Sequence, residues 1–403
     1  MTERADVVVI GAGQAGLATS HELTEAGVEH VVLERARIGE TWRGRWDSFC
    51  LVTPNWSVRL PGRAYDGQDP DGYMRRDEIV AYLEAYAAGF RAPVREGVAV
   101  ESLVPSTGGG FLLRTSEGEF RAERVVVATG AYQRPHRPTS ARTLPPDLVQ
   151  IDAEEYRNPA ALPAGGVLVI GSGQSGCQIA EELREAGREV FLACGKAPWA
   201  PRRVGDRDLV WWVMETGFFD MPLSALPTPA ARLTANILGT GRNGGHDLNL
   251  RTLRAAGVTL LGHFLGAEDG RARFATDLAE TVAWGDARYR EFGQIFQKLA
   301  AERGLPVPEL PEPEPFDGRS PEELDLTSLG AVVYACGFRP DYGSWVKVPG
   351  AFDPLGFPIH SDGASTAAPG LYFVGVHFLR SRKSALLCGV GEDAAVVARQ
   401  IAD

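Results

Sequence analysis

Two glycine-rich turns have the spacing in this 403-residue chain that most directly predicts chemistry. In the pattern G-x-G-x-x-G, the first glycine permits a tight turn, the second lets the backbone approach a pyrophosphate, and the third lets a helix pack closely on a strand. The N-terminus of the helix that follows then favours the phosphate charge. Each turn predicts a dinucleotide site, so the chain is expected to hold two dinucleotides. The turns are Gly11-Ala12-Gly13-Gln14-Ala15-Gly16 and Gly171-Ser172-Gly173-Gln174-Ser175-Gly176.

The segments around both turns fit this interpretation. Around the first turn, Val7–Ile10 is typical of a buried strand, Leu17–Ala26 of a helix, and Val31–Leu33 of a second strand. We therefore expect a duplicated strand–turn–helix–strand unit in an α/β fold with two Rossmann-like domains. The corresponding segments of the second copy are Gly166–Ile170, Cys177–Ala186 and Glu189–Ala193.

The residues that end the second strand of each unit differ in charge. The first unit has Glu34 there, and a carboxylate accepts hydrogen bonds from ribose hydroxyls. The second unit has Cys194-Gly195-Lys196, with Arg202 and Arg203 just beyond. A missing acid and nearby cations favour a ribose 2′-phosphate. We therefore predict FAD in the first unit and NADPH in the second. The alternative is that these three cations form an ordinary solvated surface.

Two strand-end turns and a tryptophan-rich loop are expected near the ligands. Apolar runs close on Ala128-Thr129-Gly130 and on Ala335-Cys336-Gly337, which suits a backbone that passes close to a ligand. Trp42, Trp46 and Trp56 lie in one loop with several arginines. This loop either folds over a large flat ligand or is an aromatic surface loop. Its position beside a dinucleotide turn favours the first hypothesis.

The middle of the chain gives weaker signals. A group of prolines between residues 135 and 146 predicts a connection between domains. Residues 199–249 show no clear strands, whereas Thr281–Trp284 has the pattern of a short strand and Ala287–Arg303 that of an amphipathic helix. Five prolines between residues 306 and 315 predict an extended connector.

Composition and charge narrow the class of partner. A formal net charge of −11 argues against nucleic acid and anionic membrane surfaces. The five cysteines are scattered without metal-ligand spacing, which indicates free thiols in a reducing compartment. No stretch approaches the ~20 apolar residues of a membrane span. We expect a cytoplasmic protein with a small-molecule substrate and without bound metal, and a homodimer is left open.

Collected in order, these motifs resemble the group B flavin-dependent monooxygenases, the flavin-containing and YUCCA-type family. The sequence departs from the family at Glu40, which replaces a glycine, and at Cys336, which replaces a threonine. It also keeps only Tyr156 of the family signature that spans residues 146–156. The resemblance covers nearly the whole chain through Gly11–Gly16 with Glu34, Gly39-x-Thr41-Trp42, Ala128-Thr129-Gly130, Gly171–Gly176, Ala335-x-Gly337-Phe338-Arg339-Pro340-Asp341 and Gly370-Leu371-Tyr372-Phe373-Val374-Gly375.

The resemblance implies an oxidoreductase with a two-stage reaction. NADPH reduces FAD by hydride transfer, and the reduced flavin takes up O2 as a C4a-(hydro)peroxyflavin that inserts one oxygen atom into a small organic substrate. It also implies a glutathione-reductase-like arrangement, with an FAD domain at 1–145 and 335–403 and an NADPH domain inserted at 160–330. Asn55 is the candidate for a polar side chain beside the flavin, the alternative being an exposed turn asparagine. Further cofactor contacts are expected at Arg35, Thr41, Trp42 and Val100.

Two other classes of function stay open. A flavin disulfide reductase also has two dinucleotide units, but it needs a redox dithiol, and here only folding can bring a pair such as Cys50 and Cys388 together. A flavin-dependent NAD(P)H oxidase, reductase or redox sensor would oxygenate no substrate. Reduction of the flavin by NADPH, and its reoxidation by O2, separate these classes.

Overall fold

Strand β1 (Thr2–Ile10) lies in the middle of the first sheet of the computed structural model, which describes residues 2–403. Val7 and Val9 pack against helices on one face of this sheet, while Val8 and Ile10 pack into a separate core on the other face. A strand that is buried on both faces is a continuous apolar run rather than an alternating one. This is why Val7–Ile10 is recognisable in the sequence.

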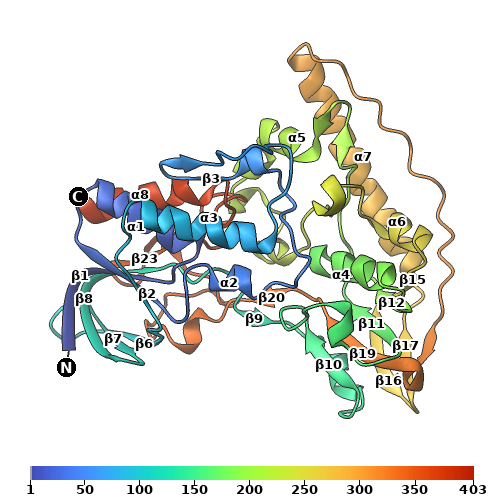
Figure 1. Cartoon of the computed structure of the whole chain (residues 1–403), viewed down its shortest axis with the longest axis horizontal. Helices are drawn as coiled ribbons and strands as arrows, with labels where there is room; N and C mark the ends of the chain where they lie inside the picture. The colour runs from blue at the N-terminus through green and yellow to red at the C-terminus, as the bar shows by residue number, and fades with distance from the viewer. Residues whose placement is uncertain (1) are drawn as a thin grey trace.

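The first sheet has a parallel centre in the order β23-β8-β1-β2-β5. Helices α1 (Gln14–Glu25), α3 (Arg76–Gly89) and α8 (Val390–Ala402) cover one face (Figure 1). An antiparallel meander of β6 and β7 extends from β8 on the other side. The strands of this sheet are β2 (His30–Glu34), β5 (Val94–Glu96), β6 (Val100–Pro105), β7 (Phe111–Thr115), β8 (Gly118–Val127), β21 (His360–Ser361), β22 (Ala364–Ser365) and β23 (Leu371–Phe373).

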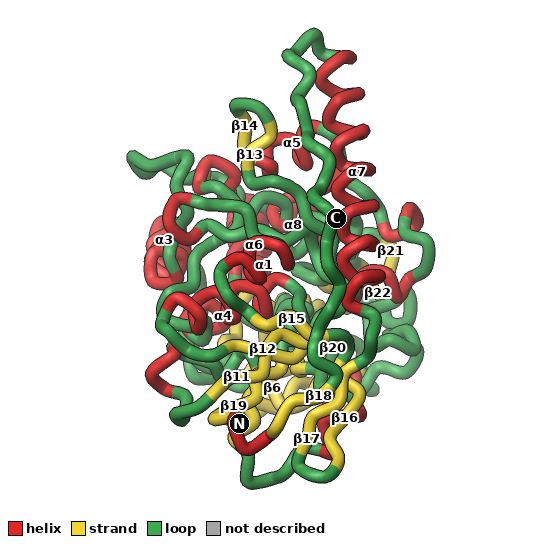
Figure 2. Tube along the Cα trace, turned by 90° about the vertical axis from the view of Figure 1, so that its right-hand side faces the viewer, coloured by secondary structure: helices red, strands yellow, loops and turns green. Residues whose placement is uncertain are grey.

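The second sheet is parallel throughout, in the order β10-β19-β11-β12-β15. Val167 and Val169 of β11 face helices α4 (Gln174–Glu185), α6 (Leu250–Ala255) and the start of α7 (Leu278–Glu302). The opposite face is covered by a small antiparallel sheet of β16, β17 and β18 (Figures 1 and 2). The strands are β10 (Val149–Asp152), β11 (Gly166–Ile170), β12 (Val190–Ala193), β15 (Thr259–Leu261), β16 (Phe264–Glu268), β17 (Arg271–Phe274), β18 (Glu323–Asp325) and β19 (Leu329–Tyr334).

The second sheet is inserted into the first. Strands of the first sheet come from residues 2–127 and 360–373, whereas strands of the second come from residues 149–334. The two connections between them pair as antiparallel strands, β9 (Arg134–Pro135) with β20 (Phe338–Arg339). The predicted fold class is confirmed: an α/β protein with two Rossmann-like units, the second inserted in the first. The limits 1–145, 160–330 and 335–403 stay a proposal, to which we add β10 as the start of the inserted domain.

One predicted strand is wrong. Thr281–Trp284 lies inside helix α7, which begins at Leu278 rather than at Ala287 and extends away from the second sheet (Figures 1 and 2). Thr281 and Val282 are buried there against the second sheet, so a four-residue apolar run marks a buried helical turn. Such a run cannot be assigned to strand or helix by periodicity alone.

The proline-rich segment follows α7 as an extended chain. The hydroxyl of Tyr289 donates to the carbonyl of Pro311 at 2.6 Å, and Gln297 donates to that of Pro308 at 3.3 Å. Along residues 2–403, no helix is both long and apolar enough to cross a membrane, and no cluster of acidic, histidine and cysteine side chains has the makings of a metal site. The remaining short elements are α2 (Glu40–Arg43), α5 (Leu209–Glu215), β3 (Arg59–Leu60), β4 (Arg63–Ala64), β13 (Arg203–Val204) and β14 (Arg207–Asp208).

Candidate functional site

The first glycine turn has the shape that a bound pyrophosphate requires. Gly11 has a φ of +105°, which favours glycine. A Cβ on Gly16 would lie 1.8 Å from the carbonyl oxygen of Gly11, so only glycine lets α1 pack this closely on β1. A Cβ on Gly13 would meet no atom within 4 Å, so the turn is open on that side. Gly13 is the N-cap residue of α1 and has no side chain to cap the helix, and the first turn of α1 contains no acidic residue. The backbone N–H groups at this end of the helix are therefore left for an anion.

Glu34 lies beside this turn with a fixed orientation. Its buried carboxylate accepts hydrogen bonds from the backbone N–H of Ala12 at 2.7 Å and of Ala36 at 3.0 Å. These two contacts hold the carboxylate between the glycine turn and the end of β2. Its remaining acceptor capacity fits the ribose hydroxyls of a dinucleotide.

Three segments that are distant in sequence surround the first turn. The side chain of Gln14 accepts a hydrogen bond from Trp42 Nε1 at 3.0 Å and donates to the carbonyl of Ala385 at 3.2 Å. A Cβ on Gly11 would lie 2.9 Å from the carbonyl oxygen of Ala128, and one on Gly375 would lie 2.5 Å from Ala15 Cβ. Three segments therefore meet at the first glycine turn: the tryptophan loop, the Ala128–Gly130 turn and the C-terminal segment that contains Gly375 and Ala385.

The other predicted FAD contacts lie around the same edge of the first sheet. Arg35 directly follows β2 and is exposed, as is Thr41 in α2. Val100 begins β6, close to the end of β2 because the backbone N–H of Val98 donates to the carbonyl of Glu34 at 2.9 Å. Thr129 is exposed beside Gly130. Their contacts with FAD stay predictions.

The second turn repeats the two tight glycine contacts of the first. Gly171 has a φ of +107°, and a Cβ on Gly176 would lie 1.8 Å from the carbonyl oxygen of Gly171. The carbonyl of Ala335 takes the place that Ala128 has in the first unit, 2.6 Å from a Cβ on Gly171. Gly173 is the N-cap residue of α4 and makes no side-chain cap, and Gln174 and the half-buried Ser175 follow it. Unlike Gly13, Gly173 has a neighbour, since a Cβ on it would lie 3.7 Å from Ala235 Cβ. The backbone of this turn also fits a pyrophosphate.

The position of Glu34 has no acidic counterpart in the second unit. Cys194 stands there, fully buried. The hydroxyl of Ser172 accepts from the backbone N–H of Gly195 at 2.9 Å and donates to the carbonyl of the same residue at 2.8 Å. The side chain of Lys196, next in the chain, is exposed. The residues present fit a dinucleotide that has a phosphate rather than a free hydroxyl at this ribose.

Arg202 does not fit its predicted role as a phosphate ligand. It is buried in a two-point ion pair with Asp208, at 2.8 Å from Nε to Oδ2 and 2.8 Å from Nη2 to Oδ1. Its Nη1 donates to the carbonyl of Val52 at 2.7 Å, and Tyr73 donates to Asp208 at 2.9 Å. Arg202 therefore ties the inserted domain to the tryptophan loop. Arg203 is exposed, and its contact with a phosphate stays a prediction.

Asn55 and Trp46 also have structural positions. Asn55 is buried, where its side chain accepts from the backbone N–H of Met74 at 2.7 Å and donates to the carbonyl of Asp69 at 2.9 Å. This amide shapes its own loop, so we do not retain it as a catalytic residue. Trp46 is buried in the core of the inserted domain, with its ring 6.5 Å from that of Tyr156. It links the two domains instead of stacking on a ligand.

An aromatic cluster lies beyond the ends of three strands, at residues that the sequence did not single out. The ring of Tyr132 lies 5.2 Å from that of Phe338 and 4.7 Å from that of His377. Tyr132 is 45% exposed. Each of the three residues follows a strand-end glycine by one or two positions, which is the signal that could have found them.

The aromatic cluster has a distinct electrostatic character. Burial lowers the pKa of His377 to about 4, so its imidazole is neutral near pH 7. Arg45 lies with its guanidinium carbon 5.9 Å from the ring of Tyr132, and burial lowers its pKa. Phe378, next to His377, has a φ of +54°, a strained conformation for a bulky residue. Strain of this kind clusters at functional sites.

The segment 201–249 of the inserted domain reaches over to the C-terminal part of the chain. The backbone N–H of Arg382 donates to the carbonyl of Met221 at 2.9 Å, and Lys383 pairs with Asp220 at 2.7 Å. The guanidinium of Arg382 lies between two rings, 4.2 Å from Phe218 and 4.8 Å from Phe378. These contacts hold the two domains together on the side where Phe378 lies.

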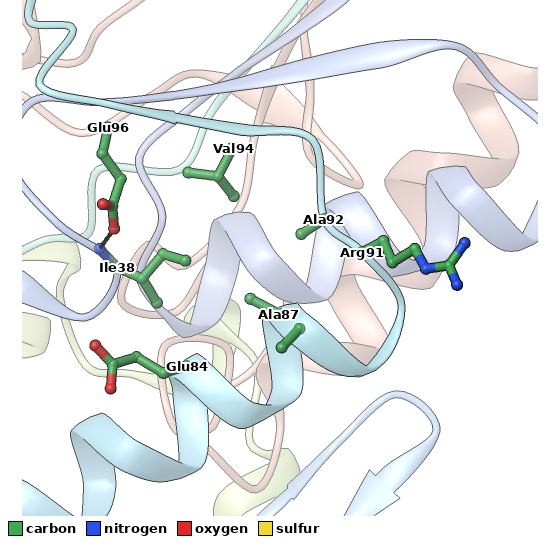
Figure 3. A pocket seen from close by; sticks show the side chains of 8 residues that line it. Ile38, Glu84, Ala87, Arg91, Ala92, Val94 and Glu96 are labelled. Atoms are coloured by element: carbon green, nitrogen blue, oxygen red, sulfur yellow. Dashed lines mark hydrogen bonds between the residues drawn. The ribbon is translucent and has the colours of Figure 1, made fainter.

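A separate surface pocket contains none of the residues of either glycine turn. Figure 3 shows this pocket of about 370 Å³, between helix α3 and strand β5. Small apolar side chains such as Ala87 and Val94 line it, with Glu84, Arg91 and Glu96 at its edges. It offers no group suited to redox chemistry, so we assign no function to it.

The five cysteines are free thiols, and four of them are buried. Burial raises the pKa of Cys50, Cys336 and Cys388 to about 11 and that of Cys194 to about 12. Burial also raises the pKa of Cys177. Thiols with such pKa values are protonated near pH 7, whereas a redox dithiol needs a thiolate.

Comparisons with known proteins agree with this geometry. A profile of the family described as "Pyridine nucleotide-disulphide oxidoreductase" matches residues 8–214. The "Uncharacterized oxidoreductase CzcO-like" of Geobacillus kaustophilus (strain HTA426) is 34% identical over 391 residues, which are 96% of either protein. "Indole-3-pyruvate monooxygenase YUCCA1" of Oryza sativa subsp. japonica is 33% identical over 228 residues, covering 50% of this chain and 56% of the relative. The solved flavin-containing monooxygenase from Stenotrophomonas maltophilia shares the fold, with a TM-score of 0.70 at 21% identity over 99% of this chain and 98% of that one.

Substitutions at the second and third glycines of the first turn are predicted to cause different defects. Gly13→Ala places a methyl group in open space, so we expect unchanged stability of the FAD-free protein but at least ~tenfold weaker FAD binding, about 1.4 kcal/mol. Gly16→Ala forces α1 away from β1 and should lower the free energy of unfolding by about 2 kcal/mol or more. Urea unfolding and FAD titration measure the two effects. Equal stability of both variants would contradict the packing argument.

Adjacent arginines offer a second matched pair. Arg202→Ala leaves Asp208 buried without its partner, so we expect the free energy of unfolding to fall by about 3 kcal/mol or more. Arg203→Ala removes an exposed side chain and should change it by less than about 0.5 kcal/mol. Thermal or urea unfolding of the two proteins tests this. A stable Arg202→Ala protein would remove the case for a structural ion pair.

Proposed function

Since this chain belongs to the pyridine nucleotide-disulphide oxidoreductase family, we propose that it is an FAD-dependent, NADPH-consuming monooxygenase of a small organic substrate. The observation that carries the proposal is the pair of glycine turns with different strand ends. Glu34 ends the strand in one unit, and Cys194-Gly195-Lys196 follow in the other. The partial relatedness to an enzyme named as a monooxygenase, and the shared fold of a flavin-containing monooxygenase along the whole chain, support the same reaction class.

Residues of both units would bind and orient the two cofactors and the substrate. The N-terminus of α1 binds the FAD pyrophosphate and Glu34 its ribose, while the N-terminus of α4 binds the NADPH pyrophosphate. Bound FAD supplies hydride acceptance and reaction with O2. The pairing of β9 with β20 sets how the two units face each other. The cluster of Tyr132, Phe338 and His377 would give the substrate an aromatic surface.

The disulfide-reductase alternative lacks the reactive pair of cysteines that its reaction requires. Cys50 and Cys388 are both buried and form no disulfide, and burial raises the pKa of either thiol to about 11. A dithiol that attacks a disulfide needs an accessible thiolate. The oxidase and redox-sensor alternatives need no further residue, so they are outcomes of the test. For the molecule as a whole, we propose a cytoplasmic location and leave a homodimer as a prediction for sedimentation measurements.

The test measures both the consumption of NADPH and the transfer of an oxygen atom from O2 to a product. The FAD-loaded protein is mixed with NADPH and isotopically labelled O2 in the presence of candidate amines, thioethers, ketones and 2-oxo acids. We expect one class to raise NADPH consumption and to yield a product that contains one labelled oxygen atom. Because a monooxygenase couples the two, labelled product should account for most of the NADPH consumed. Hydrogen peroxide in amounts equal to the NADPH consumed, with no labelled product from any class, would favour the oxidase alternative.

A further inference from the structure

His263 lies beside the carboxyl end of β12, where the second unit has no counterpart of Glu34. Strands β12 and β15 are parallel neighbours, so their carboxyl ends lie side by side. Gly195 follows β12 and His263 follows β15. A Cβ on Gly195 would lie 3.7 Å from Nε2 of His263. The imidazole therefore lies beside the Cys194–Lys196 turn, where the distinction between NADPH and NADH is expected.

The backbone of His263 is held on two sides. Its N–H donates to Asp277 Oδ1 at 3.0 Å, and its carbonyl accepts from the N–H of Ala275 at 2.9 Å. The preceding Gly262 has no room for a side chain, because a Cβ would lie 1.8 Å from the carbonyl oxygen of Ala275. The histidine is therefore positioned before any ligand binds.

Asp277 also fixes the ring. Its Oδ2 is hydrogen-bonded to Nδ1 of His263. Asp277 is the N-cap residue of α7, where an aspartate usually caps the helix, but its carboxylate makes no capping bond. The bonds to His263 hold the pKa of this carboxyl below its usual value, against the opposing effect of burial. Among residues 2–403, no group is hydrogen-bonded to Nε2 of His263, and the side chain is 50% exposed.

We propose that His263, together with Lys196, binds the 2′-phosphate of NADPH. This proposal rests on the assignment of NADPH to the second unit. A protonated imidazole donates Nε2–H to a phosphate oxygen, while Asp277 stabilises the charge from the Nδ1 side. Arg202 is excluded from this task by its ion pair with Asp208. His263 therefore has the phosphate-binding role that was predicted for Arg202.

The experiment measures nucleotide binding without turnover. Isothermal titration at one fixed pH gives the affinity of the FAD-loaded protein for 2′,5′-ADP and for 5′-ADP. The wild type is compared with His263→Gln. The matched control is His246→Gln, since His246 is another partly exposed histidine of the inserted domain that pairs with a carboxylate, that of Glu181 at 2.7 Å. The affinity for 5′-ADP reports whether each variant keeps its fold.

We expect His263→Gln to bind 2′,5′-ADP about tenfold more weakly than the wild type, as for loss of a charged hydrogen bond. Affinity for 5′-ADP should stay unchanged in both variants, and His246→Gln should behave as the wild type.

Two contrary results have different meanings. If the wild type prefers 2′,5′-ADP but His263→Gln keeps that preference undiminished, the role of His263 is refuted while the assignment of NADPH stands. If the wild type binds both nucleotides equally, or neither, the assignment of NADPH falls and the role of His263 falls with it.

Discussion

The close contact between a helix and a strand in each unit is the constraint on which the rest of this structure depends. The carbonyl oxygen of Gly11 occupies the space that a side chain on Gly16 would need, and Gly171 and Gly176 repeat this contact. Only this approach brings the uncapped N-termini of α1 and α4 to the carboxyl ends of their sheets. Phosphate binding, ribose selection and the position of both cofactors follow from it.

The second requirement is that the two units face each other in one arrangement. The pairing of β9 with β20, the burial of Trp46 in the inserted domain and the ion pair of Arg202 with Asp208 act at different places along this contact. Segment 201–249 adds the stacking of Arg382 between Phe218 and Phe378. These interactions explain why aromatic and basic residues are concentrated in loops near the ligands without themselves being ligands.

Short sequence patterns predicted those features of the fold that depend on the backbone geometry of neighbouring residues. The β-branched run at Val7–Ile10, the spacing of the glycines and the position of Glu34 are dictated by backbone geometry, so the fold class and the two dinucleotide units followed from them. The sequence could not show that the side chains of Arg202 and Asn55 are already engaged, because their partners are distant in sequence or depend on loop geometry. Tyr132, His377 and His263 each come after a strand-end glycine, but so do other residues, and only the alignment of neighbouring strands singles these three out. Thr281–Trp284 was misassigned because four apolar residues fit a strand and a helix turn equally well.

The central claim is that the two turns hold FAD and NADPH so that hydride passes between them. The most direct measurement mixes the FAD-loaded protein with NADPH, and separately with NADH, in the absence of O2 and follows the visible absorbance of the flavin. The account predicts complete loss of that absorbance with NADPH, at a higher rate than with the same concentration of NADH. A flavin that stays oxidised with both nucleotides would contradict the account, because the second turn would then have no role in reducing the first cofactor.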